Sequence, residues 1–224
     1  MKPVYTVRRA VTPPPLDAAW EGPEWREVAS LNVAHFHPES SAHRPRTEAK
    51  LVYDAAGLYG MFRVEDRYVV CAHTAYQSPV CRDSCVEFFV RPRPDKGYMN
   101  FEMNCCGALL LYYIEDPTRT PDGFAKFTKV PADVGGQVGV RGTFDGPNAE
   151  EIAEPVVWTL TFRIPITVLE AYVGALGDPS GQEWAANFYK CADGSSHPHW
   201  GAWASIGEQL NFHQPECFGA LCFV

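Results

Sequence analysis

Short stretches in which apolar and polar residues alternate make up much of the chain and predict β-strands. Two of them, residues 84–91 and 98–105, are rich in Val, Phe and Tyr. They flank residues 92–97, Pro-Arg-Pro-Asp-Lys-Gly, whose composition is typical of a turn. The pattern therefore predicts an antiparallel hairpin over residues 84–105.

Alternation along the second strand of this hairpin separates polar and aromatic side chains from apolar ones. The first face holds Tyr98, Asn100, Glu102 and Asn104, and the other holds Met99, Phe101 and Met103. A turn that pairs Arg91 with Tyr98 places Glu87 opposite Glu102. It also places Cys85 opposite Asn104. One sheet face is therefore expected to collect carboxylates and carboxamides.

The pattern predicts a second hairpin from residues 48–54 and 58–66, with Ala-Ala-Gly as its tight connection. Residues 155–165 alternate strongly and indicate a half-buried strand. Residues 166–173 follow Pro165 directly and predict a short helix, the only one expected. Residues 116–136 contain three prolines and an Asp-Gly pair, and we expect a long loop there.

Strands follow one another closely along the sequence, without the strand–helix–strand rhythm of a parallel sheet. The remaining predicted strands are residues 5–9, 30–36, 107–115, 137–144, 183–190 and 217–224. Because prolines follow residues 5–9, we expect that strand at a sheet edge. The predicted fold is all-β, an antiparallel β-sandwich of the immunoglobulin or jelly-roll kind with one short helix, in a single domain over residues 1–224.

Charge and hydropathy exclude several classes of partner. The net charge is −8, and no cluster of Lys and Arg offsets it, which argues against a nucleic-acid partner. No apolar run has the length of a membrane span. The first residues lack the apolar segment of a secretory signal, so we expect a cytoplasmic protein.

Eight cysteines are spread along the chain without Cys-x-x-Cys spacing, which argues against a zinc ribbon. We expect most of them to be reduced and buried as small apolar side chains. Cys81 and Cys85 flank Arg82, whose charge favours a reactive thiolate. The alternative for Cys85 is packing beside Cys105, reduced or bridged, in a strand register shifted by one residue.

Four segments, in order, resemble the family 9 carbohydrate-binding modules. Residues 15–25 resemble the opening Pro-aliphatic-Asp segment with its Trp, and residues 51–66 resemble the second hairpin. Asp-Ser-Cys-Val-Glu-Phe-Phe at 83–89 matches the family's Asp-Ser-x-Val-Glu strand. Residues 158–189 resemble its late Trp strand, the Ile-Pro helix start and a Trp-x-x-Asn strand. Together these segments cover most of the chain.

This resemblance implies a β-sandwich that binds sugar ends, often with structural calcium and often fused to a glycoside hydrolase. It places Glu87 at the sugar-binding acid and Asn187 at the binding carboxamide. In that family two Trp rings hold the sugar. Here residues 80–82, directly before Asp83, contain no Trp, and the nearest rings include Tyr76 and Tyr189.

The expected site combines the polar face of residues 84–105 with residues 187–203, whose Gly, Pro and Ser indicate a surface loop. Acids and amides bind several hydroxyls at once, and a ring covers the apolar sugar face. The candidate ligand-binding residues are Glu87, Asn100, Glu102, Asn104, Asn187, Tyr189, Lys190, His199, Trp200 and Trp203. The predicted function is non-catalytic binding of a mono- or oligosaccharide, linked to polysaccharide breakdown.

Three alternatives remain open from the sequence. Glu87 and Glu102 could form the carboxylate pair of a glycoside hydrolase. A transition metal could bind His197 and His199, with His213 and Cys191 as further donors. Haem could bind between His and Met, for which the available methionines are Met61, Met99 and Met103.

Overall fold

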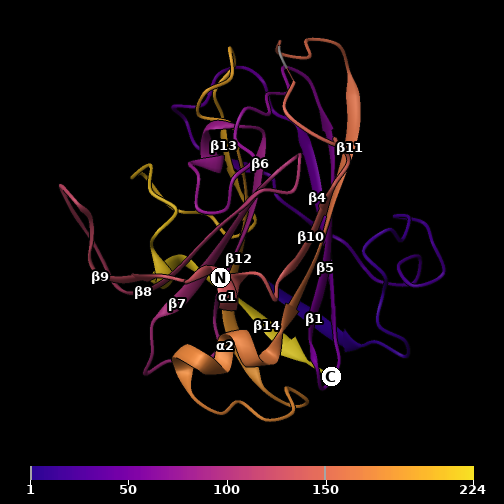
Figure 1. The fold of residues 1–224 in the computed structure, drawn as a ribbon, viewed down its shortest axis with the longest axis vertical. Helices are drawn as coiled ribbons and strands as arrows, with labels where there is room; N and C mark the ends of the chain where they lie inside the picture. Colours follow the sequence, from indigo (N-terminus) through magenta and orange to yellow (C-terminus); the bar gives the residue numbers. More distant parts are fainter. Residues whose placement is uncertain (1, 149) are drawn as a thin grey trace.

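Two facing β-sheets form the body of the protein in the computed structural model, which describes residues 2–148 and 150–224 (Figure 1). One sheet contains β3 (His35–Phe36), β6 (Cys85–Arg91), β7 (Tyr98–Asn104), β8 (Leu109–Thr120), β9 (Gly123–Lys129), β12 (Glu183–Cys191), β13 (Trp200–Ala202) and β14 (Gly219–Phe223). The other contains β2 (Leu31–Asn32), β4 (Arg46–Tyr53), β5 (Gly57–Asp66), β10 (Gly139–Gly142) and β11 (Val156–Pro165). The all-β sandwich predicted from the sequence is confirmed.

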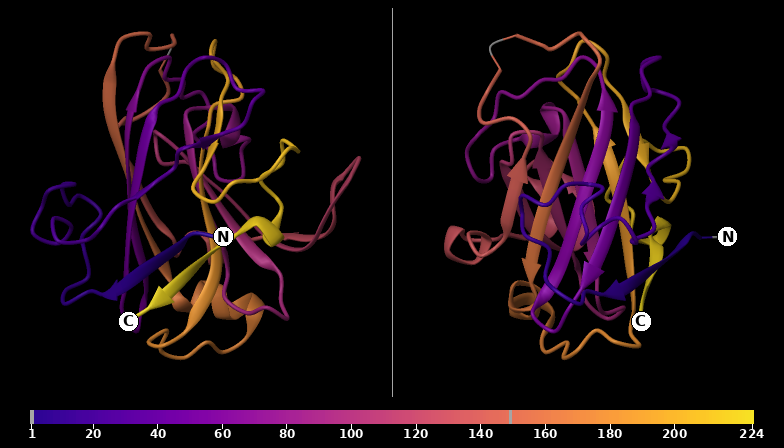
Figure 2. Two further views of the ribbon diagram at one scale, coloured as in Figure 1. Left: turned by 180° about the vertical axis from the view of Figure 1, so that it is seen from behind. Right: turned by 90° about the vertical axis from the view of Figure 1, so that its right-hand side faces the viewer.

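Strand β1 (Val4–Arg9) belongs to both sheets. Its first residues pair with β14 and its last residues pair with β4, in both cases in parallel (Figure 2). The prediction of an edge strand was therefore wrong. The prolines at 13–15 lie beyond the strand, where they remove no ladder hydrogen bond.

Aromatic rings from the two sheets meet in the main core. Phe62 of β5 lies 5.9 Å from Phe188 of β12, and Phe162 of β11 lies 5.6 Å from Phe88 of β6, between ring centroids. All four rings are buried. Because β6 and β12 direct Phe88 and Phe188 inward, the residues next to them in sequence face outward, away from the opposite sheet.

The predicted helix is confirmed as α2 (Ile166–Val173), which begins directly after Pro165. The loop predicted over residues 116–136 was wrong. Strands β8 and β9 extend through this region as an arm that projects from the body, and α1 (Ala132–Gly135) follows (Figure 1). Most side chains of the arm are solvent-exposed, so its sequence lacks the apolar alternation that identifies a half-buried strand.

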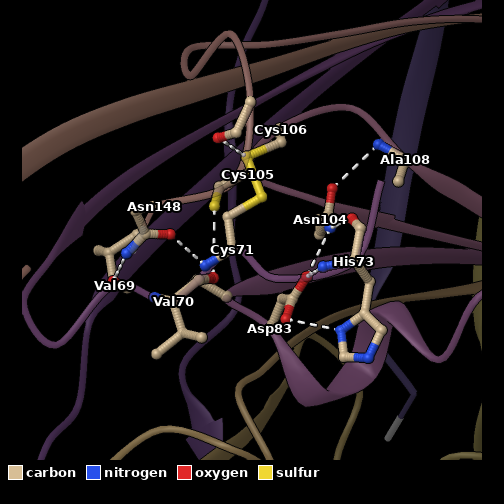
Figure 3. Close-up of a disulfide and its surroundings, with 12 residues drawn as sticks. Val69, Val70, Cys71, His73, Asp83, Asn104, Cys105, Cys106, Ala108 and Asn148 are labelled. Carbon is tan, nitrogen blue, oxygen red and sulfur yellow. Dashed lines mark hydrogen bonds and ion pairs between the residues drawn. A yellow bond between two sulfur atoms is a disulfide. The ribbon is translucent and has the colours of Figure 1, made fainter. Parts of the chain in front are cut away.

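Six of the eight cysteines are free, and Cys71 and Cys106 form a disulfide (Figure 3). Cys105 lies beside it as a free buried thiol. Cys85 pairs with Asn104 in the ladder, so the register is the predicted one and the shifted alternative is excluded. Between residues 2 and 224, leaving aside position 149, no helix has the length and apolarity needed to cross a membrane.

Candidate ligand-binding site

The polar side chains of the β6–β7 hairpin lie on the outer face of their sheet, in the predicted register. Glu87 is directly opposite Glu102 on β7, and Tyr189 of β12 is its neighbour on the other side. Glu87 and Glu102 are only 3% and 7% exposed. Strand alternation and the tight turn therefore place two carboxyl groups side by side on a shielded surface.

A pocket of about 510 Å³ lies over this face. Glu87, Glu102 and Cys191 form its floor. Its walls come from β8 and β9, from β13 and the loop after it, and from the two short segments that precede β6 and follow β12. The residues of these walls are Cys81, Leu110, Tyr112, Arg119, Phe124, Asp193, Trp200, Gln209, Leu210, Asn211, Phe212 and His213.

The two carboxyl groups of the floor have altered acidity. Burial raises the pKa of Glu87 well above its ordinary value, and the charge of Glu102 adds to this effect. Burial also raises the pKa of Glu102, to about 7, although the Asn100 amide donates a hydrogen bond to it at 2.7 Å. At neutral pH the pair therefore holds a proton, so it can both donate and accept hydrogen bonds.

Trp200 is held at the rim by an acid of the pocket wall. Its indole N–H donates to Asp193 Oδ1 at 2.7 Å, and its ring is partly exposed. Phe212, another residue of the pocket lining, stacks on Tyr189 with ring centroids 4.1 Å apart, and the Tyr189 hydroxyl donates to the Phe212 carbonyl at 2.9 Å. Both contacts fix aromatic surfaces around the carboxyl pair before any ligand arrives.

His213 closes the pocket beside the arm. Its Nδ1 lies 2.9 Å from the Tyr98 hydroxyl, and its ring packs against Phe124 and Phe89. Burial lowers the pKa of His213 to about 3, with a further contribution from Arg119. The imidazole is therefore neutral at physiological pH, and Arg119 is the cationic group of the pocket lining.

Three of the predicted site residues lie beneath or beside the pocket with their amides already engaged. Asn100 donates to Glu102 and accepts from the Tyr112 backbone N–H. Asn187 exchanges two hydrogen bonds with the backbone of Ala204. Asn104 donates to Asp83 and to the His73 carbonyl and accepts from the Ala108 N–H (Figure 3). These amides position strands and loops.

Lys190, His199 and Trp203 lie outside the pocket. Alternation along β12 directs Lys190 away from Tyr189 and Cys191, into the space between the sheets. There its Nζ lies 2.8 Å from His199 Nε2 and 3.4 Å from Asp66 Oδ2. Trp203 packs edge-on against Phe188 in the core, with ring centroids 5.7 Å apart. Of the predicted residues, the structure brings Glu87, Glu102 and Trp200 together at the pocket surface, with Tyr189 behind them.

The sequence did not single out several pocket residues. Arg119 and Phe124 lie on the arm that was predicted as a loop, and residues 209–213 carry no motif. Asp193 lies in the stretch 187–203, which the sequence did identify as one wall. The sequence signal for Asp193 is its position: it lies two residues after the end of a strand and directly before a Gly-Ser-Ser turn.

Expectations about cysteine reactivity need correction. Burial raises the pKa of Cys85 to about 12, and burial together with Glu102 and Glu87 raises the pKa of Cys81 even further. The prediction that Arg82 favours a thiolate was therefore wrong, because desolvation and neighbouring acids outweigh one solvent-exposed guanidinium.

The metal and haem alternatives do not match the arrangement of their residues. His199 contacts Lys190, His213 contacts Tyr98, and His197 stacks on Tyr68 with centroids 3.6 Å apart. The candidate haem ligands are all buried in apolar clusters, namely Met61, Met99 and Met103. Across residues 2–148 and 150–224, both groups of three or more His, Cys, Asp or Glu donors are cysteine-rich, unlike the all-oxygen set of a calcium site.

The sandwich and its pocket define a class of β-sheet binding proteins whose ligand site combines carboxyl groups with aromatic rings. The chain belongs to carbohydrate-binding family 9, whose family model matches residues 24–223. The family resemblance found in the sequence is thereby confirmed. No curated protein sequence matches the chain.

Solved structures share the fold across nearly the whole chain. A protein from Bacteroides uniformis, described as a candidate carbohydrate-binding protein, is 24% identical with a TM-score of 0.85 and full coverage of both chains. A family 9 module from Caldicellulosiruptor kristjanssonii was solved with glucose; it is 13% identical, with a TM-score of 0.64 and coverage of 98% of this chain and 95% of that one. The same kind of module with cellotriose is 14% identical, with a TM-score of 0.65 and coverage of 99% and 93%.

Proposed function

We propose that the protein binds carbohydrate, without catalysis, in the pocket over Glu87 and Glu102. The observation that carries this proposal is the buried carboxyl pair in a pocket that Trp200, Tyr112 and Phe124 also line. Carboxyl groups that hold a proton offer donors and acceptors to sugar hydroxyls, and aromatic rings cover the apolar face of a pyranose. The glucose and cellotriose bound by similar family 9 modules supply the first ligands to test.

The arrangement of the carboxyl groups supports binding over hydrolysis. Glycoside hydrolases place their two carboxyl groups on either side of the scissile bond. Here Glu87 and Glu102 are direct cross-strand neighbours on one floor, so a sugar above them meets both from the same side. We therefore expect the protein to bind a sugar and not to hydrolyse aryl glycosides.

Isothermal titration calorimetry with glucose, cellotriose and a panel of other mono- and oligosaccharides tests the proposal. We expect Glu102→Gln and Trp200→Ala each to weaken binding by about tenfold or more, since each removes a contact worth about 1–2 kcal/mol. Glu27→Gln and Trp20→Ala are matched controls, because Glu27 is exposed and Trp20 packs on Lys50 at the other sheet. Absence of binding to every sugar, or equal affinity in all four variants, would contradict the proposal.

A further inference from the structure

A second group of side chains lies at and beneath the pocket floor, and sugar binding does not require it. Cys85 of β6 is directly opposite Cys191 of β12, and Glu87 lies two residues further along β6 on the same face. One donor atom from each of these residues lies within 4.8 Å of the other two, and Cys191 Sγ is 3.2 Å from Glu87 Oε1. We propose that Cys85, Cys191 and Glu87 bind a divalent cation of the zinc class.

The donor set selects the type of cation. Two sulfurs and one carboxylate oxygen suit zinc and chemically similar ions, whereas calcium and magnesium require oxygen ligands throughout. All three donors come from paired central strands and are nearly inaccessible to solvent, at 0%, 3% and 1% exposure for Cys85, Glu87 and Cys191. The sheet thus holds them in one place in the absence of a metal, which lowers the entropic cost of binding.

The position of the group at the pocket gives the cation an entry route and a free coordination position. Cys191 and Glu87 both line the pocket, and Glu102 faces Glu87 from the neighbouring strand. Three protein ligands leave the fourth position of a tetrahedral ion for water or for Glu102. The group is therefore closed on the core side by strands and reachable from the pocket side.

The charges around the group also favour a cation. Within the described parts of the chain, neither Glu87 nor Glu102 makes an ion pair with Lys, Arg or His. Lys190 is adjacent to Cys191 in sequence but points into the sandwich toward Asp66. The two thiols, and the carboxyl pair where Glu87 carries its proton, would release their protons to solvent as the ligands form, and the divalent ion would compensate the negative charge that results.

This inference does not rest on the proposed function, because no sugar takes part in it. The experiment uses full-length protein that has been stripped with chelator, kept reduced, and titrated with Co²⁺ as a spectroscopic probe and then with Zn²⁺. We expect one equivalent of Co²⁺ to produce a thiolate-to-metal charge-transfer band in the near ultraviolet. Zn²⁺ should then abolish the band by displacement.

Substitutions assign the ligands. Cys85→Ser and Cys191→Ser should each weaken Co²⁺ binding by more than about tenfold, and Glu87→Gln should weaken it while leaving the thiolate band in place at saturation. Cys222→Ser is the matched control, since Cys222 lies on β14 outside the pocket. Circular dichroism and thermal unfolding establish that each variant is folded.

Two results would overturn the inference. One is a wild-type protein that shows no charge-transfer band at stoichiometric Co²⁺, and this result needs no variant. The other is a band that survives in both Cys85→Ser and Cys191→Ser. Neither outcome depends on calorimetry with sugars, so failure of the metal site and failure of sugar binding are distinguished.

Discussion

Glu87 and Glu102 face each other across the β6–β7 ladder, and both carboxyl groups are almost fully buried. Like charges at directly opposite positions of a ladder destabilise a sheet, and burial increases this effect. The folded protein responds by keeping a proton, as the raised pKa values of both groups show. Replacing one of the two carboxyl groups with a neutral amide removes this repulsion and should stabilise the folded protein.

The first prediction concerns the stability of Glu102→Gln in the metal-free protein. The folded-state pKa of Glu102 is about 7, above its ordinary value of 4.5. The stability that protonated Glu102 contributes to the folded protein is therefore fully present below about pH 4.5 and is lost as the pH rises to about 7. Glutamine does not ionise, and its side-chain oxygen retains the hydrogen bond from Asn100. We expect the variant to gain about 3 kcal/mol over wild type at pH 8 and nothing at pH 4.

Urea unfolding at the two pH values measures this difference. Glu27→Gln, an exposed substitution on the opposite part of the molecule, is the control and should show no pH-dependent gain. Equal stability changes at pH 4 and pH 8 in Glu102→Gln would mean that the carboxyl pair does not hold a proton in the folded state.

The second prediction concerns the ion pair between Lys190 and Asp66 in the space between the sheets. Both side chains are fully buried, and Asp66 also accepts hydrogen bonds from Trp158 and from the His43 ring. Burial alone would raise the pKa of Asp66, but Lys190 and His43 hold it well below its ordinary value. Lys190→Met should therefore cost about 3–5 kcal/mol, because it leaves a buried carboxylate without its cation.

A double-mutant cycle separates this effect from lost packing. Adding Asp66→Asn to Lys190→Met should restore most of the lost stability, since the remaining pair is neutral. Sugar affinity should stay unchanged throughout, because Lys190 points away from the pocket. A double variant that is as unstable as the sum of the two single variants would contradict the predicted coupling.

The β6–β7 hairpin was predictable because two local signals agree. Alternation assigned the polar face, and the turn composition fixed the register, so the cross-strand position of Glu87 and Glu102 followed from the sequence. The helix after Pro165 was predictable for a similar reason, since proline favours the first position of a helix.

Three other features were not predicted, each for a different reason. Lys190 was grouped with its sequence neighbours, although period-2 alternation alone directs it to the opposite face from Tyr189. Most side chains of the β8–β9 arm are exposed, and its few apolar residues do not alternate, so its strands depend on backbone pairing that leaves no hydropathy pattern. The disulfide joins Cys71 to Cys106 across 35 positions, a pairing that sequence spacing cannot identify.

The third prediction is a pH effect at His213. Burial depresses its folded-state pKa to about 3, below the ordinary value of 6.5. The stability that neutral His213 contributes is therefore fully present above about pH 6.5. It is lost as the pH falls toward 3, because only the unfolded chain takes up the proton in this range. His213→Asn places an amide near Nδ1 and should flatten the stability–pH curve in this range by up to about 1.4 kcal/mol per pH unit.

Denaturant unfolding between pH 4 and pH 7 tests this expectation. The exposed His35→Asn substitution serves as the control. An unchanged slope in His213→Asn, with the control also unchanged, would show that His213 is protonated in the folded protein despite its apolar surroundings of Phe89 and Phe124.

The fourth prediction concerns the link between Cys71 and Cys106, which ties the segment after β5 to the turn between β7 and β8 (Figure 3). Titration of thiols in unfolded, unreduced protein should detect six groups, and prior reduction should raise the count to eight.

The double variant Cys71→Ala, Cys106→Ala should lose about 3–4 kcal/mol of unfolding free energy, since the cross-link restricts the unfolded chain over the 35 positions between the two cysteines. Cys217→Ala is the control for loss of a thiol outside the disulfide. Eight reactive thiols before reduction would contradict the disulfide itself, whereas six thiols with unchanged stability in the double variant would contradict its contribution to folding.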